Sequence, residues 1–150
     1  MPKQPLTVFG YLLIAAMLGA CVTTTSTVVV PDTQPGDQIQ VEYLLDKWCT
    51  NRDETAESNQ AAGFSGLLNI SPVFWRFGPE GQWDASTSGF VYQPLGSWKI
   101  VGLDNLELSR NGREPKSYQV RFKNNEEGPD LYLTDDKGQF TVLSRCKKLF

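Results

Sequence analysis

The side chains that most often carry nucleophilic catalysis or bind transition metals are sparse in this sequence. The 150-residue chain contains no histidine, which excludes Ser-His and Cys-His pairs and imidazole metal sites. A nucleophile elbow requires the pattern Gly-x-Ser-x-Gly, but Leu67 replaces the glycine needed two residues after Ser65. We therefore expect no enzyme activity, no catalytic residue and no cofactor.

Two pairs of adjacent carboxylates are the remaining candidates for cation binding. They are Asp135-Asp136 and Glu126-Glu127, and carboxylate oxygens are the ligands that Ca²⁺ prefers. Adjacent acidic residues in a turn more often interact with water and with the turn's own backbone. We therefore expect no metal site.

Aromatic side chains are dense between residues 74 and 98. The set is Phe74, Trp75, Phe77, Trp83, Phe90, Tyr92 and Trp98. Most of them are expected to fill the core of a small β-domain. In a regular strand Trp75 and Phe77 lie on the face opposite Phe74, so one face is a candidate ligand or partner surface. The candidates for that surface are Trp75, Phe77, Trp83, Tyr92 and Trp98.

The first twenty residues have the organisation of a secretory signal. Lys3 supplies a positive charge, an apolar run follows from Val8 to Met17, and Gly19 and Ala20 precede Cys21. The apolar run is about half the roughly 20 residues that a membrane-spanning helix needs. We expect residues 1–20 to be removed.

The sequence Leu18-Gly19-Ala20-Cys21 resembles the lipobox of bacterial lipoproteins. That resemblance implies cleavage before Cys21 and acylation, including palmitate, of this cysteine, which would anchor the protein to a membrane. Val22 stands where the inner-membrane retention signal of enteric-type bacteria has aspartate. The resemblance therefore implies a lipid-anchored protein of the cell outer membrane that faces the periplasm.

The chain after residue 20 is acidic and long enough for one domain. Lys3 is the only charged residue removed with the signal, so 13 basic and 17 acidic residues remain, a net charge of −4. This balance excludes nucleic acid as a partner, because phosphate binding needs clustered positive charge. Residues 21–37 are rich in Thr and Pro and predict a flexible tether, and residues 38–150 predict the folded domain.

Cys49 and Cys146 are the two cysteines that remain if Cys21 is acylated. In an oxidising periplasm, an isolated pair is expected to form a disulfide. This bond would join the start of the folded domain to its end, and would place its first and last strands side by side.

The rest of the chain is dominated by short β-strands and turns. Residues 38–49 fit both a helical stripe and a strand, and we expect a short helix running into a first strand near Trp48. Residues 51–71 predict a long connection or a short helix with loops. Tyr118, Val120 and Phe122 alternate with polar residues, as in a strand with one buried face. Aromatic and glycine-containing hairpins precede and follow this strand, which predicts a small antiparallel β-barrel, with a β-sandwich as the alternative.

These elements resemble the lipocalin-like domains of bacterial lipoproteins. The motifs that carry the resemblance are Trp48, the hairpin with Phe77, Gly81 and Trp83, the run Gly96-Ser97-Trp98, and a final Asp-Lys-Gly hairpin before Arg145-Cys146. The resemblance implies a small closed barrel. We expect a non-catalytic interaction module for an envelope protein, and the alternative is a binder of a small apolar or amphipathic ligand.

Overall fold

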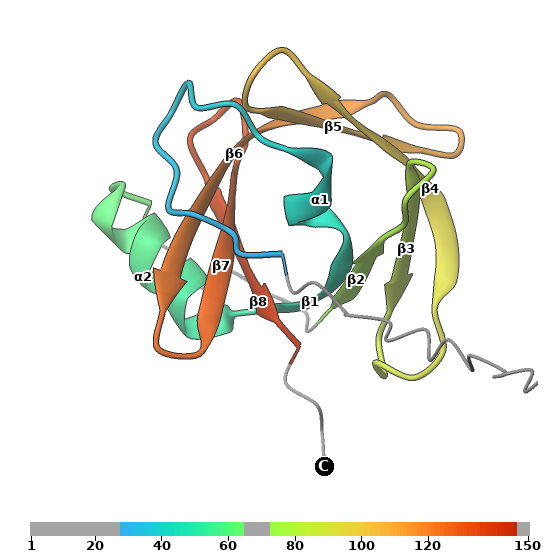
Figure 1. Ribbon diagram of the computed structural model, residues 1–150, viewed down its shortest axis with the longest axis horizontal. Helices are drawn as coiled ribbons and strands as arrows, with labels where there is room; N and C mark the ends of the chain where they lie inside the picture. Colours follow the sequence, from blue (N-terminus) through green and yellow to red (C-terminus); the bar gives the residue numbers. More distant parts are fainter. Residues whose placement is uncertain (1–27, 65–72, 147–150) are drawn as a thin grey trace, which may run out of the picture.

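A closed antiparallel β-barrel forms the body of the protein in the computed structural model, which describes residues 28–64 and 73–146 (Figure 1). Eight strands follow one another around the barrel, each hydrogen-bonded to its neighbours in the sequence. They are β1 Asp46–Thr50, β2 Phe74–Phe77, β3 Gln82–Ser86, β4 Gln93–Val101, β5 Asn105–Arg110, β6 Lys116–Asn125, β7 Gly128–Thr134 and β8 Phe140–Arg145. The predicted barrel is confirmed, and the sandwich is not formed.

The first and last strands close the barrel, as the cysteine pair predicted. Strand β1 pairs with β8 through Trp48 opposite Arg145 and Thr50 opposite Leu143. The Cys49–Cys146 disulfide joins the two ends of this seam, with the two Cα atoms 5.0 Å apart. The disulfide prediction is therefore confirmed in the structure.

Helix α1, Val41–Leu44, closes one end of the barrel. It lies inside the ring of strands in Figure 1, and Leu44 is completely buried. The ring of Tyr43 packs edge-on against Phe122, with 5.9 Å between the ring centroids. The short helix predicted before the first strand is thus present, and it acts as a plug; we call this end of the barrel the α1 end.

Helix α2, Arg52–Ala61, begins where β1 stops. Asn51 is its N-cap and accepts a hydrogen bond from the backbone nitrogen of Glu54 at 3.1 Å, which satisfies one of the free donors of the first turn. Among the described residues, no helix is long and apolar enough to cross a bilayer. The predicted signal peptide, Cys21 and Ser65 lie outside the described residues.

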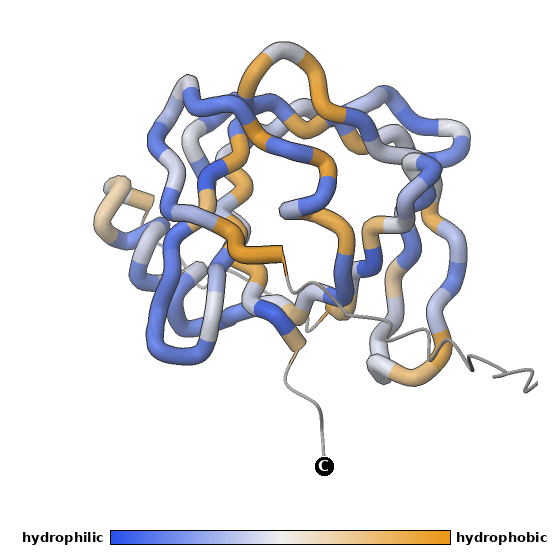
Figure 2. Tube along the Cα trace, in the orientation of Figure 1, coloured by the Kyte–Doolittle hydropathy of each residue, from blue (hydrophilic) through white to orange (hydrophobic). Residues whose placement is uncertain are grey.

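The barrel interior contains the apolar face of the alternating strands, seen as orange segments in Figure 2. On β5 the inward residues are Leu106 and Leu108, and on β6 they are Val120 and Phe122, all buried. Figure 2 also shows apolar segments outside this core, at the start of the described chain and around the β4–β5 turn.

The structure corrects the predicted boundary between tether and domain. Residues 21–37 are predicted as a flexible tether, but Val30 and Thr33 are buried against the barrel. The backbone nitrogen of Thr33 donates to the oxygen of Phe122 at 2.9 Å, and that of Gly36 donates to the Asp104 carboxylate at 2.7 Å. The described residues from Val30 onward are therefore packed on the barrel, because this segment satisfies backbone groups of β6.

Candidate functional site

Four of the five predicted surface residues face the barrel interior. Phe77, Trp83 and Trp98 are buried, and Trp75 packs against the same core. The pairing explains this orientation, because Trp75 lies opposite the fully buried Trp48 and therefore shares its inward row. Ring contacts join the set, with Trp75 and Trp83 centroids 5.3 Å apart. These side chains form core, and Phe74 and Arg76 are the residues of β2 that point outward.

Trp98 also has a structural role at the β2–β3 turn. Its indole nitrogen donates to the oxygen of Gly78 at 3.1 Å, and its backbone nitrogen donates to the oxygen of Gly81 at 2.8 Å. Gly81 has a φ of 75°, a left-handed conformation that glycine adopts without strain. The tryptophan therefore holds the aromatic hairpin against β4.

Trp83 has an unusual polar environment. Its side chain is only 8% exposed, and its indole nitrogen is the one buried side-chain polar atom without a hydrogen-bond partner among the described residues. Most buried indole nitrogens have a partner, because an unpaired buried donor is unfavourable.

Tyr92 is the predicted site residue that lies outside the barrel. Its ring packs beside two cations, with the Lys47 ammonium 5.5 Å and the Arg76 guanidinium 5.0 Å from the ring centroid. Burial raises the pKa of the Tyr92 hydroxyl, and the charge of Arg76 opposes that rise. Arg76 also forms an ion pair with Asp84 on the neighbouring strand. Tyr92, Lys47 and Arg76 thus form a cation-aromatic stack on the outer face of β1 and β2.

Phe90 and Val91 extend this stack at the β3–β4 loop. They are 75% and 69% exposed, the largest exposures of any described aromatic and of any described aliphatic residue except Val29. Phe90 belongs to the dense aromatic set but is not among the five predicted surface residues. The signal was present, because Ser86-Thr87-Ser88-Gly89 before it and Pro94 after it are turn residues. We call Lys47, Arg76, Phe90, Val91 and Tyr92 the Tyr92 patch.

The loop that presents Phe90 has a defined conformation. The Ser86 hydroxyl is buried and accepts hydrogen bonds from the backbone nitrogens of Ser88 at 3.2 Å and Gly89 at 2.9 Å. A Cβ atom on Gly89 would lie 3.1 Å from the ring of Phe74. These contacts hold the loop on β2, so the exposed apolar pair is presented by an ordered turn.

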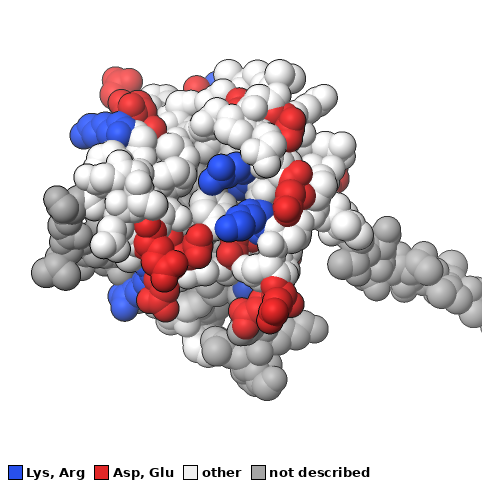
Figure 3. Space-filling view, turned by 90° about the vertical axis from the view of Figure 1, so that its left-hand side faces the viewer, with Lys and Arg blue, Asp and Glu red and all other residues white. Residues whose placement is uncertain are grey.

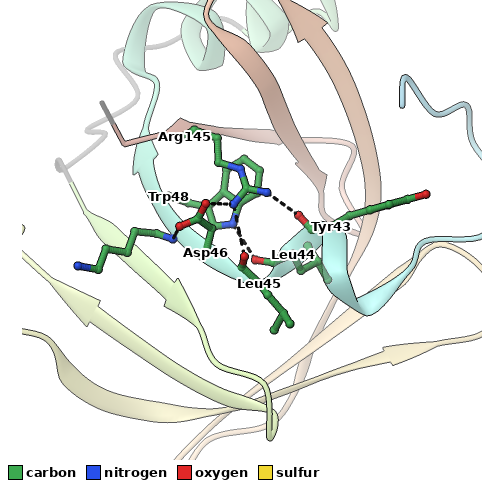
Figure 4. A network of polar contacts seen from close by, with 7 residues as sticks. Tyr43, Leu44, Leu45, Asp46, Trp48 and Arg145 are labelled. Atoms are coloured by element: carbon green, nitrogen blue, oxygen red, sulfur yellow. Dashed lines mark hydrogen bonds and ion pairs between the residues drawn. The ribbon is translucent and has the colours of Figure 1, made fainter. Parts of the chain in front are cut away.

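Arg145 forms a second cluster of polar contacts, at the α1 end (Figure 4). Its guanidinium lies 4.2 Å from the centre of the Trp48 ring, donates to the oxygen of Tyr43 at 3.1 Å, and pairs with Asp46. Burial lowers the pKa of Arg145, and Asp46 opposes the change. Because its donors serve the end of α1, this arginine is a latch for the plug.

Two open grooves border this latch. One has a volume of about 480 Å³ and is lined by Val28, Glu42, Leu45, Asp46, Pro129 and Arg145. The other, of about 490 Å³, lies beside the β2–β3 turn and shares Leu45 and Asp46 with the first. The α1 end of the barrel is therefore hollowed on both sides of the helix-strand junction.

Charges of opposite sign are interspersed on the face that carries α2, shown in Figure 3. One contact on this face joins Arg121 to the ring of Tyr132, 5.2 Å from the centroid, and Glu54 accepts a hydrogen bond from the Tyr132 hydroxyl at 2.5 Å. This hydrogen bond and burial raise the pKa of Tyr132, with burial the larger cause. In the described part of the chain, no group of three acidic or cysteine side chains gathers as a metal site.

No protein-family model, curated protein or solved structure matches the chain significantly. Functional inference therefore depends on the residues themselves: an interior packed with aromatic side chains, one unpartnered indole donor within it, and one exposed apolar loop beside two cations.

Proposed function

We propose that this protein is a non-catalytic lipoprotein of the bacterial envelope, anchored through Cys21, that docks an envelope protein with the Tyr92 patch. The observation that carries the docking proposal is the exposure of Phe90 and Val91 on an ordered loop. Apolar side chains held out in water mark interaction sites. Aromatic and arginine residues contribute most of the binding energy at protein interfaces.

The side chains of the Tyr92 patch indicate what kind of surface the partner has. Phe90 and Val91 fit an apolar pocket, and Lys47 with Arg76 favours acidic side chains at its rim. Tyr92 between them offers an aromatic face and a hydroxyl, which suits a boundary that is part apolar and part polar. The patch is small, so the interaction fits a transient complex better than an obligate one.

Site-specific photo-crosslinking in intact cells tests the docking site. A photoreactive residue at position 91 should yield a discrete adduct, whereas one at Glu114, exposed on the β5–β6 loop, should not. Replacing Tyr92 with Ala should abolish the adduct at 91 while the barrel stays folded, because Tyr92 lies outside the core. Equal adducts from positions 91 and 114 would refute a specific site.

The anchor has a separate test. Mass spectrometry of the protein from cells should show Cys21 as an acylated N-terminus, and Cys21→Ser should release the protein from the membrane fraction. An unmodified N-terminus at another residue would refute the anchor, and would leave the docking result intact.

The unpartnered indole of Trp83 favours a second candidate function, the binding of a small apolar ligand inside the barrel. Ligand cavities combine apolar walls with a few polar groups, and an unpaired donor in an apolar interior matches that combination. A fatty acid carries an acyl chain for the walls and a carboxylate that can accept from the indole.

Tryptophan fluorescence during titration with palmitate tests this second function. Binding that is lost in Trp83→Phe, a variant that keeps the ring and removes the donor, would support it. If wild-type fluorescence does not change, the interior is core alone. In that case Trp83→Phe should be neutral or stabilising by up to about 1–3 kcal/mol, because it removes an unsatisfied buried group.

A further inference from the structure

Exposed apolar side chains are concentrated at one end of the barrel. Of the seven large hydrophobic residues that are exposed in the described part of the chain, five lie there: Val28, Val29, Val41, Val101 and Leu103. We call these five the apolar rim. The other two, Phe90 and Val91, belong to the Tyr92 patch.

Contacts between the segments place the apolar rim at the α1 end. The backbone nitrogen of Ile39 donates to the oxygen of Leu103 at 2.8 Å, which brings the β4–β5 turn beside the residues that lead into α1. Val28 and Glu42 line the same groove. Figure 2 shows the corresponding apolar segments at the start of the described chain and at the β4–β5 turn.

Phe90 and Val91 lie toward the opposite end of the same strands, whereas Lys47 and Arg76 of the Tyr92 patch lie nearer the α1 end. Asp46, the first residue of β1, pairs with Phe77, the last residue of β2, so the β2–β3 turn is at the α1 end. Strand β3 then runs away from that end to Ser86, and the loop with Phe90 follows. The two exposed apolar groups are therefore separated along the barrel.

The chain that would carry the lipid leaves from the α1 end. Val30, near the start of the described residues, is held on the barrel, where its oxygen accepts from the side-chain nitrogen of Asn124 at 2.9 Å. Cys21 precedes it by nine residues, and nine residues span at most about 30 Å. A lipid on Cys21 therefore restricts the distance of this end from the bilayer.

Given the proposed anchor at Cys21, we propose that the apolar rim contacts the membrane surface, so that Phe90 and Val91 point away from the bilayer. The rim is aliphatic and spread over three segments, which fits a fluid lipid surface better than a single pocket of a partner protein. Glu42 is exposed beside it, and Arg145 is occupied by Asp46 and backbone oxygens.

Nanodiscs allow a direct test with the whole mature chain. Cys21 is the one free thiol, because Cys49 and Cys146 form the disulfide, so it can be coupled to a maleimide phospholipid. The discs contain phosphatidylcholine and a gadolinium-chelating headgroup, and methyl NMR reads the paramagnetic relaxation of Val and Leu residues. The methyl groups of Val41, Val101 and Leu103 should relax several-fold faster than those of Val91.

Matched variants sharpen the result. Val101→Ser with Leu103→Ser should reduce the relaxation at Val41, whereas Val91→Ser should not. Equal relaxation at Val41 and Val91, or a larger effect at Val91, would overturn the rim contact. That failure is distinct from failure of the anchor, which the mass of Cys21 from cells reports separately.

Discussion

Strands β8 and β6 each lack a neighbouring strand over part of their length, and the chain covers these two open edges differently. Strand β1 pairs with β8 only at residues 143–145, which leaves the edge at 140–142 open. Strand β5 pairs with β6 only at residues 116–119, which leaves the edge beyond Val120 open. Unpaired edges attract other chains and lose backbone hydrogen bonds, so both need a cover.

Helix α2 covers β8 with side chains. The Asn59 amide donates to the oxygen of Phe140 and accepts from its nitrogen, each at 2.8 Å, which reproduces the pattern of a neighbouring peptide group. The Thr55 hydroxyl accepts from the nitrogen of Val142 at 2.9 Å. Both side chains are almost completely buried, so water cannot replace them.

The N-terminal segment covers β6 with an extended stretch of chain. Thr33 exchanges two hydrogen bonds with Phe122, one through its backbone nitrogen and one through its hydroxyl at 2.8 Å. Further along, the Asp32 carboxylate accepts from the backbone nitrogen of Asn124 at 2.6 Å. Asp32 and Asn124 are exposed, so water competes for this part of the cover.

The difference indicates that the contribution of these contacts to stability depends more on their burial than on the number of hydrogen bonds. Removing a buried partner leaves a backbone group unsatisfied, and removing an exposed partner lets water take its place. We therefore expect the contribution to stability to fall from the β8 seam to the exposed end of the β6 cover.

The largest effect is expected at the disulfide, which closes the part of the β8 seam that α2 does not cover. Replacing Cys49 and Cys146 together with Ser should lower the free energy of unfolding by about 2–5 kcal/mol, because the bond restricts a long loop of the unfolded chain. Urea unfolding with and without reductant measures this loss. A variant as stable as the wild type would show that the β1–β8 pairing suffices alone.

Asn59→Ala should follow, with a loss of about 2–4 kcal/mol, because it leaves both backbone groups of Phe140 without a partner. Gln60→Ala is the matched control on the exposed face of α2, and it should change stability by less than about 0.5 kcal/mol. The urea midpoint measures both variants. Similar midpoints for the two would contradict the role of α2 as an edge cover.

Thr33→Val should cost about 1–2 kcal/mol, since it keeps the shape of the side chain but leaves the nitrogen of Phe122 without its acceptor. Thr33→Ser keeps the hydroxyl and should recover most of the loss. A larger effect for Thr33→Val than for Asn59→Ala would reverse the ranking of the two covers.

The smallest effect is expected at Asp32 and depends on pH. The hydrogen bond from the Asn124 backbone is the main cause that holds the pKa of the Asp32 carboxyl below its ordinary value. Because the pKa of Asp32 is lower in the folded state, its ionised carboxylate stabilises the fold at pH values above the pKa of the unfolded chain, about 4. This contribution disappears as the pH falls through the pKa of the folded state. The amide NMR signal of Asn124 should shift over that acidic range, and Asp32→Asn should abolish the shift.

Alternating apolar residues made most of the barrel predictable, because Tyr118, Val120 and Phe122 repeat at the period of a strand with one buried face. The isolated cysteine pair likewise predicted the closing seam. The alternation is a local pattern and the disulfide depends on only two residues, so both can be predicted without knowledge of the three-dimensional contacts.

The two edge covers could not be predicted in the same way. Helix α2 buries only Thr55 and Asn59, so its packed face is polar and has no apolar stripe for a periodicity analysis to find. The segment at Val30 to Thr33 has the composition of a tether and gains its order from β6. The orientation of the aromatic residues could not be predicted either. Alternation places Phe74 on one face and Trp75 and Phe77 on the other, but it does not indicate which face is inside the barrel.

The order of strands around the barrel has a consequence for how the protein folds. Seven of the eight strand pairings join neighbours in the sequence, and only the pairing of β1 with β8 joins distant segments. Local hairpins can form early, because they close short loops, whereas the final seam must wait for the end of the chain. Under reducing conditions, native-state hydrogen exchange should therefore reveal β1 and the edge of β8 opening together before the hairpins between β4 and β7.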